Sequence, residues 1–202
     1  LSVVHFIFVL YLAIIAQFII QLIALSVNGI NPIVYMKKSL ALLILAFTSR
    51  SSVGCLPVTI ETLTQKLGVN QATASFVAGF GTTAGMQGCA GIFPSLLIVY
   101  VCHLTGTAMD FSMIVMTIIV VTLGSLGIAG IPGTATMAAS VGLSGVGMAS
   151  SFSLIGPILA IDPLIDMART MLNVSGSVTN ALIIDKRLGN LDENIYNEIN
   201  KN

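Results

Sequence analysis

Polar residues recur at helical spacing near the end of this sequence, at Asp162, Asp166, Arg169, Asn173, Ser177 and Asn180. Successive members are four, three, four, four and three positions apart, so at roughly 100° per residue they share one stripe of a helix. Asp166 and Arg169 could form a purely structural ion pair. The stripe could instead bind a zwitterion, with aspartate taking an ammonium and arginine and asparagine taking carboxylates. Two acids, a base and two amides are more than one ion pair needs, which favours the binding interpretation.

The chain that carries this stripe has the composition of a membrane protein. Of its 202 residues 55% are hydrophobic and 8% are charged, and the mean hydropathy is +0.99. A charge at the centre of a bilayer costs about 2.5–3.5 kcal/mol on insertion scales, so a deep Arg169 is a candidate for function. Net charge is zero and no basic cluster occurs, so nucleic acid is not an expected partner.

Common enzyme signatures are absent from the sequence, which contains no HExxH, GxxxxGK[ST] or GxSxG. The cysteines at 55, 89 and 102 have neither metal-binding spacing nor an even number for a disulfide framework. We therefore expect no enzyme activity, no cofactor and no metal beyond a coupling ion.

Long apolar segments predict an all-α membrane protein. Residues 1–30 are long enough for a transmembrane helix, which needs about 20 apolar residues. Residues 69–105 form a second span, broken near 85–88 at "GMQG". The stripe lies on an amphipathic transmembrane helix over 152–185, and residues 186–202 form a polar, solvated cytoplasmic tail.

Two further segments contain apolar runs too short to cross a membrane, which predicts re-entrant hairpins. The first covers 33–67 with its tip near 50–54, and the second covers 110–149 with its tip near 130–133. Basic residues are enriched on the cytoplasmic side of membrane proteins, so we expect that side to contain Lys37, Lys38, Lys66, Lys186 and Arg187. This places the hairpins on opposite sides, as in an inverted repeat whose broken helices meet near the midplane. Hairpins that cross completely would also accommodate these charges.

The helix breaks offer backbone groups that a ligand could satisfy. "TSRSSVG" could be an ordinary turn, but free N–H groups at a half-helix N-terminus attract anions. "GIAGIPGTATMA" could be a simple membrane-helix kink or a mobile gate. "GTTAGMQGCAG" could pack closely through small residues or offer carbonyl groups to a cation.

Three of these segments, "TSRSSVGCLPVT", "GIAGIPGTATMA" and "DMARTMLNVSG", resemble in this order the dicarboxylate/amino acid:cation symporter family. The resemblance covers residues 1–188. It implies the transport-domain part of an elevator-type carrier, built from re-entrant hairpins and broken helices, that works as a lipid-embedded homotrimer spanning the plasma membrane several times. The first residue, Leu1, already lies within a hydrophobic segment, and we expect the N-terminal scaffold helices to be missing from the chain.

The family resemblance also implies a role for each residue around the substrate. Ser51 and Ser52 would hold the α-carboxylate together with Asn173, and Asp166, helped by the Arg50 carbonyl, would take the α-ammonium.

Further roles follow from the same resemblance. Arg169 would reach the distal end of the substrate with Thr170 nearby, and Cys89 replaces a threonine of the acidic-amino-acid carriers. The second tip, Ile131, Pro132 and Gly133, would close over the substrate as the outer gate.

The resemblance places the coupling cation at Gly85, Met86, Gln87, Asn173 and Ser177. Glutamate carriers have "NMDGT" where this chain has "GMQGC", and aspartate in place of Ser177. Because hard cations prefer anionic oxygen ligands, we expect one sodium or a proton rather than three sodium ions. The implied function is cation-coupled import of an amino acid, with L-cystine as the first candidate substrate. The alternatives are a dicarboxylate or glutamate-aspartate symporter, or a channel or structural membrane subunit.

Overall fold

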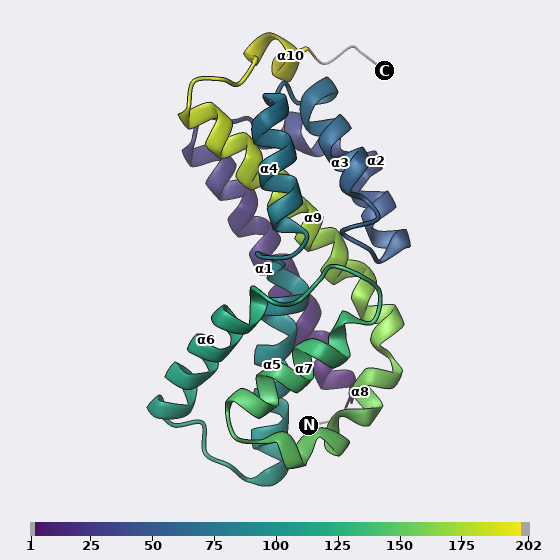
Figure 1. The fold of residues 1–202 in the computed structure, drawn as a ribbon, viewed down its shortest axis with the longest axis vertical. Helices are drawn as coiled ribbons and strands as arrows, with labels where there is room; N and C mark the ends of the chain where they lie inside the picture. The colour runs from purple at the N-terminus through teal and green to yellow at the C-terminus, as the bar shows by residue number, and fades with distance from the viewer. Residues whose placement is uncertain (1–2, 199–202) are drawn as a thin grey trace.

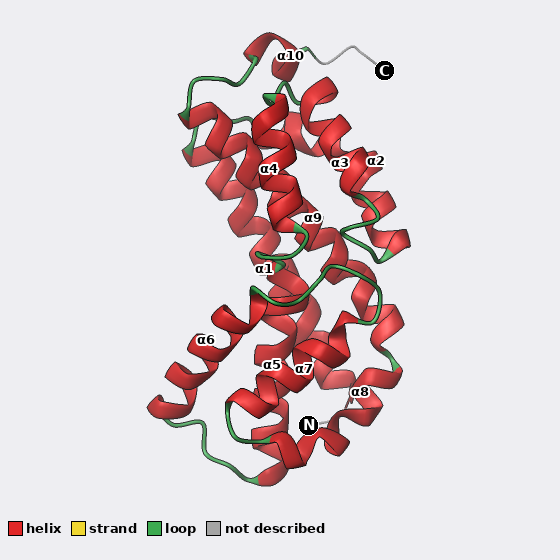
Figure 2. Cartoon of the chain, viewed as in Figure 1, coloured by secondary structure: helices red, strands yellow, loops and turns green. Residues whose placement is uncertain are grey.

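A computed structural model of the protein describes residues 3–198, and all its regular structure in that range is helical (Figure 2). Three of the described helical segments, Val3–Val27, Pro32–Ser49 and Gln87–Thr105, are long and apolar enough to cross a membrane. The molecule is elongated, with α1 running along much of its length (Figure 1).

The first two helices are joined by a short turn whose residues set both helix ends. Helix α1 (Val3–Val27) is followed by Gly29 at a φ of 72°, a left-handed conformation that glycine adopts without strain. The Asn31 side chain then accepts a hydrogen bond from Ile33 N (2.9 Å) and caps α2 (Pro32–Ser49), which starts on a proline. Helix α2 is long and apolar enough to cross a membrane even though it includes Lys37 and Lys38, so the expectation of an apolar run too short to cross is wrong for this arm of the first hairpin.

The chain turns back at residues 50–55, which we call the first tip. Arg50 is the one non-glycine residue with positive φ (56°) among those described, and its N–H closes α2 by donating to the Ala46 carbonyl. The return arm consists of α3 (Leu56–Glu61) and the π-helix η1 (Thr62–Lys66).

The expected broken span is interrupted at residues 82–86, slightly earlier than the predicted 85–88. Helix α4 (Gln71–Gly81) precedes the break. The chain resumes as a π-helix, η2 (Gln87–Ile92), and continues as α5 (Phe93–Thr105). Single π turns inside helices are frequent at functional sites.

The second pair of short helices is α6 (Phe111–Ser125), capped by the Asp110 side chain, and α7 (Thr134–Gly145). Residues 126–133 between them form the second tip, which ends with Gly133 at a φ of 88°. These two helices lie in the lower lobe of Figure 1, whereas α2, α3 and α4 lie in the upper lobe.

The prediction of one continuous helix over 152–185 is wrong. The segment comprises η3 (Ala149–Ile155), α8 (Gly156–Ala160) and α9 (Asp162–Arg187), and the chain bends by 85° between Ala160 and Asp162. Pro157 and Pro163 lie at the starts of α8 and α9. A proline lacks the N–H that would continue the preceding helix, which accounts for the bend.

Each lobe has its own apolar core, and α9 contributes to both. The lower core contains Phe93, Leu97 and Leu172, and the upper core contains Leu42, Leu63 and Val178. Because its two halves are packed in different cores, α9 is a fixed frame for the stripe between them.

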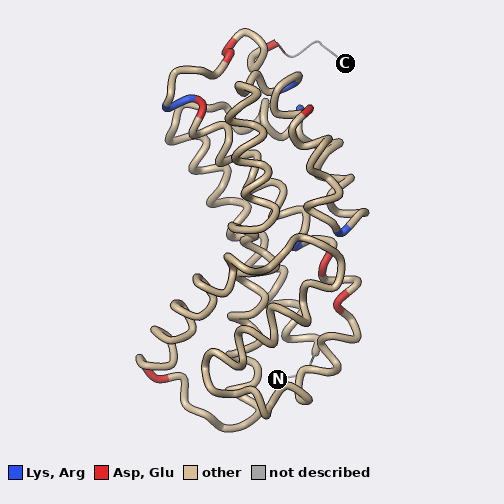
Figure 3. Tube along the Cα trace, in the orientation of Figure 1, with Lys and Arg blue, Asp and Glu red and all other residues tan. Residues whose placement is uncertain are grey.

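The described part of the polar tail is folded onto the upper lobe, contrary to the expected solvated appendage; residues 199–202 lie outside the described residues. A short helix, α10 (Glu193–Asn197), buries Tyr196 to 3% exposure. Burial raises the pKa of Tyr196, so its hydroxyl stays protonated and donates to the Asn31 carbonyl (2.8 Å). Asp192 N donates to the Gly68 carbonyl (2.9 Å), and Lys38 Nζ donates to the Ile195 carbonyl. Figure 3 shows basic residues at this end of the molecule and near its middle.

Candidate functional site

The two tips meet in the middle of the molecule through backbone contacts at Gly130. The Gly130 carbonyl accepts hydrogen bonds from Val53 N (3.1 Å) and Ser51 Oγ (3.4 Å) of the first tip. Gly130 N donates to the carbonyl of Thr82 (2.9 Å), where α4 ends. Three interrupted helices are therefore joined at one residue, and Ser52 is buried beneath the contact.

Glycine is required at position 130 because the approach is so close. A Cβ atom there would lie 2.7 Å from the Thr82 carbonyl oxygen and 2.9 Å from Ser52 Cβ. Residues Ile131, Pro132 and Gly133 of the second tip are exposed, and Thr134 Oγ1 donates to the Ala129 carbonyl (2.7 Å) to close the turn.

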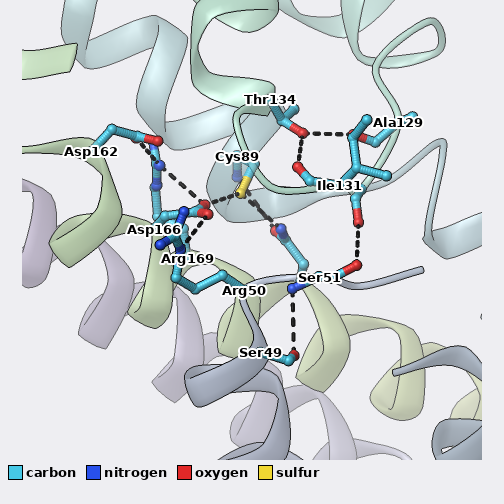
Figure 4. Close-up of polar contacts among 12 residues, drawn as sticks. Ser49, Arg50, Ser51, Cys89, Ala129, Ile131, Thr134, Asp162, Asp166 and Arg169 are labelled. Carbon is cyan, nitrogen blue, oxygen red and sulfur yellow. Dashed lines mark hydrogen bonds and ion pairs between the residues drawn. The ribbon is translucent and has the colours of Figure 1, made fainter. Parts of the chain in front are cut away.

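Beside the tips lies a cluster of four charged side chains, shown in Figure 4. Arg169 Nη2 donates to Asp162 Oδ1 and to Asp166 Oδ1, the latter at 3.1 Å. Arg50 Nε reaches Asp166 Oδ2 at 3.5 Å from the first tip. With two arginines and two aspartates, the formal charges of this cluster sum to zero.

Arg169 is fully buried and only partly satisfied. Its exposure is 0%, and its guanidinium carbon lies 3.9 Å from the ring centroid of Phe93, a cation–π contact. Its Nε and Nη1 have no hydrogen-bond partner among the described residues. Leaving buried donors bare costs free energy, about 1–3 kcal/mol for a typical group and more for a charged one. A ligand that supplied acceptors here would remove that cost.

Asn173 connects the stripe to the broken span. Its Oδ1 accepts from Gly88 N (2.7 Å) and Cys89 N (3.4 Å), and its Nδ2 contacts Cys89 Sγ at 3.1 Å. Cys89 Sγ also donates to Asp166 Oδ1 (3.5 Å). Gly88 cannot be larger, because a Cβ atom would lie 2.7 Å from the Arg169 carbonyl oxygen.

The structure thus joins five expected substrate residues into one connected set of contacts, namely Arg50, Cys89, Asp166, Arg169 and Asn173. Ser51 belongs to the contact between the tips. Thr170 is buried on the same helix, and no hydrogen bond places it within the charge cluster.

The expected cation residues divide into separate environments. Gly85 and Ser177 line a groove of about 330 Å³ between α4 and α9, together with Asn180. Asn180 is the one exposed member of the polar stripe. Met86 is buried, and Gln87 faces α1, where its Oε1 accepts from Gln17 and Gln21.

Several residues of the site were not predicted. Asp162 belongs to the stripe, but its ion pair with Arg169 was given no role. Gln17 and Gln21 could have been noticed as two amides four residues apart in a transmembrane helix, a spacing that places both on one face. Nothing in the sequence marks Phe93 as the surface beneath Arg169.

Comparisons with known proteins identify relatives of this chain. The L-cystine uptake protein TcyP of Bacillus cereus is 43% identical over 195 residues, which are 96% of this chain and 42% of that protein. The proteins of the same name from Bacillus licheniformis and Shouchella clausii are each 41% identical, over 96% and 97% of this chain. The chain spans about two fifths of the length of these relatives.

A sequence model of the sodium:dicarboxylate symporter family matches residues 1–187. The match and the relatives' names describe transport, in keeping with the expectation that the chain is not an enzyme. Together with the long apolar helices, they make this a membrane protein. The chain therefore belongs to the sodium:dicarboxylate symporter family.

Proposed function

We propose that the intact protein is a secondary active transporter that imports L-cystine across the plasma membrane by cation-coupled alternating access. The observation that carries the proposal is the buried Arg169, which pairs with two carboxylates and keeps two nitrogens unpartnered. The family and the names of the relatives support transport and this substrate. The coupling cation is sodium or a proton.

The ion pairs of the cluster suit a zwitterionic substrate. Two arginines and two aspartates already neutralise each other. A zwitterion can exchange ion pairs with them, its ammonium taking Asp166 and its carboxylates taking arginine and Asn173. Cystine has an ammonium and a carboxylate at each end and is neutral overall.

The positions of the remaining residues support the roles expected of them. Ser51 and Ser52 lie at the first tip near the charge cluster, where they would help to bind the α-carboxylate. Ile131, Pro132 and Gly133 form the exposed part of the second tip and would act as the gate. Movement of the second tip away from Val53 and Thr82 would open the site.

The arrangement of the helices supports an elevator-type transport domain with two re-entrant hairpins. The pairs α2–α3 and α6–α7 lie in opposite lobes and point their turns at each other (Figure 1). As in an inverted repeat, interrupted helices then converge on one site. We propose that the intact protein is a homotrimer surrounded by lipid, in which this chain forms the moving part.

Uptake of radiolabelled L-cystine by cells that express the intact protein tests the proposal. We expect saturable accumulation against the gradient, inhibited by unlabelled cystine more strongly than by aspartate. The assay is run with and without sodium and with a protonophore to identify the cation. Stronger inhibition by aspartate would favour a dicarboxylate or glutamate-aspartate symporter, and equilibration without accumulation would indicate a channel.

A further inference from the structure

A set of buried and half-buried amides and hydroxyls joins the broken span to α1, α2 and α9. Gln17 Nε2 and Gln21 Nε2 of α1 both donate to Gln87 Oε1, at 3.0 and 2.7 Å. Gln21 is 4% exposed and is the one polar residue among the buried residues of α1. Helix α1 otherwise buries only apolar residues, yet two of its amides donate to the single oxygen Oε1 of Gln87.

Gln21 extends this contact to two other helices. Its Nε2 also donates to the Leu172 carbonyl (3.3 Å), and its Oε1 accepts from Ser175 Oγ of α9. Ser175 Oγ is in turn 2.6 Å from the Tyr35 hydroxyl of α2. Buried polar groups joined in this way fix the relative positions of the elements that carry them, because each would be left unsatisfied by a shift.

The network leads directly to the proposed substrate site. Gln87 is the first residue of η2, and the next two residues donate their N–H groups to Asn173 Oδ1. Cys89 also contacts Asp166. The orientation of η2, and with it the hydrogen bonding of Asn173, therefore depends on where α1 holds Gln87.

The same contacts bear on whether Gln87 binds the coupling cation. An amide oxygen has two lone pairs, and Gln87 Oε1 already accepts two N–H groups. A cation at this oxygen would have to displace both glutamines of α1, and each displaced amide would then need a new partner within the membrane.

We propose that Gln17 and Gln21 are positioning residues, which act through Gln87 to hold η2 in register with the substrate site, and that Gln87 is not a ligand of the coupling cation. The inference rests on the proposed function, since it assigns these residues a part in substrate binding. It differs from the family-based expectation, which counts Gln87 among the cation residues.

Substitution by methionine tests this proposal, because it keeps the side-chain length but removes the hydrogen bonds. In the intact protein, Gln21→Met should raise the KM for labelled L-cystine about tenfold. The cation concentration for half-maximal uptake, measured by varying sodium and then pH, should change by a smaller factor than the KM. Gln17→Met, whose half-buried side chain makes one of these bonds, should act in the same direction more weakly. The matched control is Gln65→Met at an exposed glutamine outside the network, which should leave both quantities unchanged.

A double-mutant cycle separates this inference from the proposed function. Because Gln21 and Gln87 share a hydrogen bond, the loss of melting temperature in Gln21→Met/Gln87→Met should be clearly smaller than the sum of the single losses. This measurement uses the purified intact protein and needs no substrate.

Each result has a defined meaning for the two proposals. Additive losses in the cycle, a changed cation requirement with unchanged KM, or no change in either kinetic quantity would overturn the positioning role. If the unsubstituted protein takes up no amino acid, the proposed function fails, and the cycle alone decides whether the glutamines hold η2.

Discussion

The two aspartates of the charge cluster provide a matched test of the site, because both pair with Arg169 and only Asp166 is assigned to the substrate ammonium. Asp166→Asn and Asp162→Asn each keep the side-chain shape and remove one negative charge. Removing one partner of a buried ion pair costs about 3–5 kcal/mol, and this loss is common to both variants. Asp166 also loses Arg50, whose side chain is 29% exposed, which adds at most about 1 kcal/mol.

The variants should therefore be similar in stability but different in transport. Loss of a hydrogen bond to a charged group costs about 1.5–3 kcal/mol, or roughly 10- to 150-fold in affinity. Asp166→Asn should lower cystine uptake at subsaturating concentration by that additional factor relative to Asp162→Asn.

The assay compares initial uptake rates at several cystine concentrations, each divided by the amount of variant protein in the membrane. Melting temperatures of the purified intact variants measure the shared loss of stability. If the two variants lose uptake equally after this correction, Asp166 acts only as a structural partner of Arg169, and its assignment to the ammonium is wrong.

Two further predictions concern contacts outside the charge cluster. Gly130→Ala should destabilise the closed tips by about 1–3 kcal/mol because its Cβ overlaps the Thr82 carbonyl. Cleavage of the tips by added protease should therefore increase. The control variant Gly91→Ala, whose Cβ meets open space, should be cleaved like the unsubstituted protein. Tyr196→Phe should lower the free energy of unfolding by about 0.5–1.5 kcal/mol through loss of the bond to Asn31, measured as a lower melting temperature; an unchanged value would show that the tail contact contributes no stability.

Sequence patterns predicted the features of this chain that depend on local spacing. The all-helical membrane class and the family resemblance are confirmed. Both could be predicted because the length of an apolar run and a sequence motif are properties of short segments. The stripe on α9 was visible because a single helix carries it, and all of its members except Asn180 are buried.

Features that depend on contacts between distant segments were missed. The 85° bend before α9 was overlooked because the apolar pattern continues across Pro163. Gln21 meets Gln87 across 66 positions, and no periodicity in α1 indicates that partner. The polarity of the last residues suggested solvent, but Tyr196 and the Gly68 carbonyl attach them to the fold.

The junction at Gly130 has a consequence for how often the site is accessible. Its hydrogen bonds to Val53, Ser51 and Thr82 contribute about 0.5–1.5 kcal/mol each, so separating them costs a few kcal/mol. An energy gap of that size leaves the minor conformation populated at roughly 0.1–10%. If the second tip is the proposed gate, these hydrogen bonds alone would keep the closed form dominant and leave the open form accessible to thermal fluctuation.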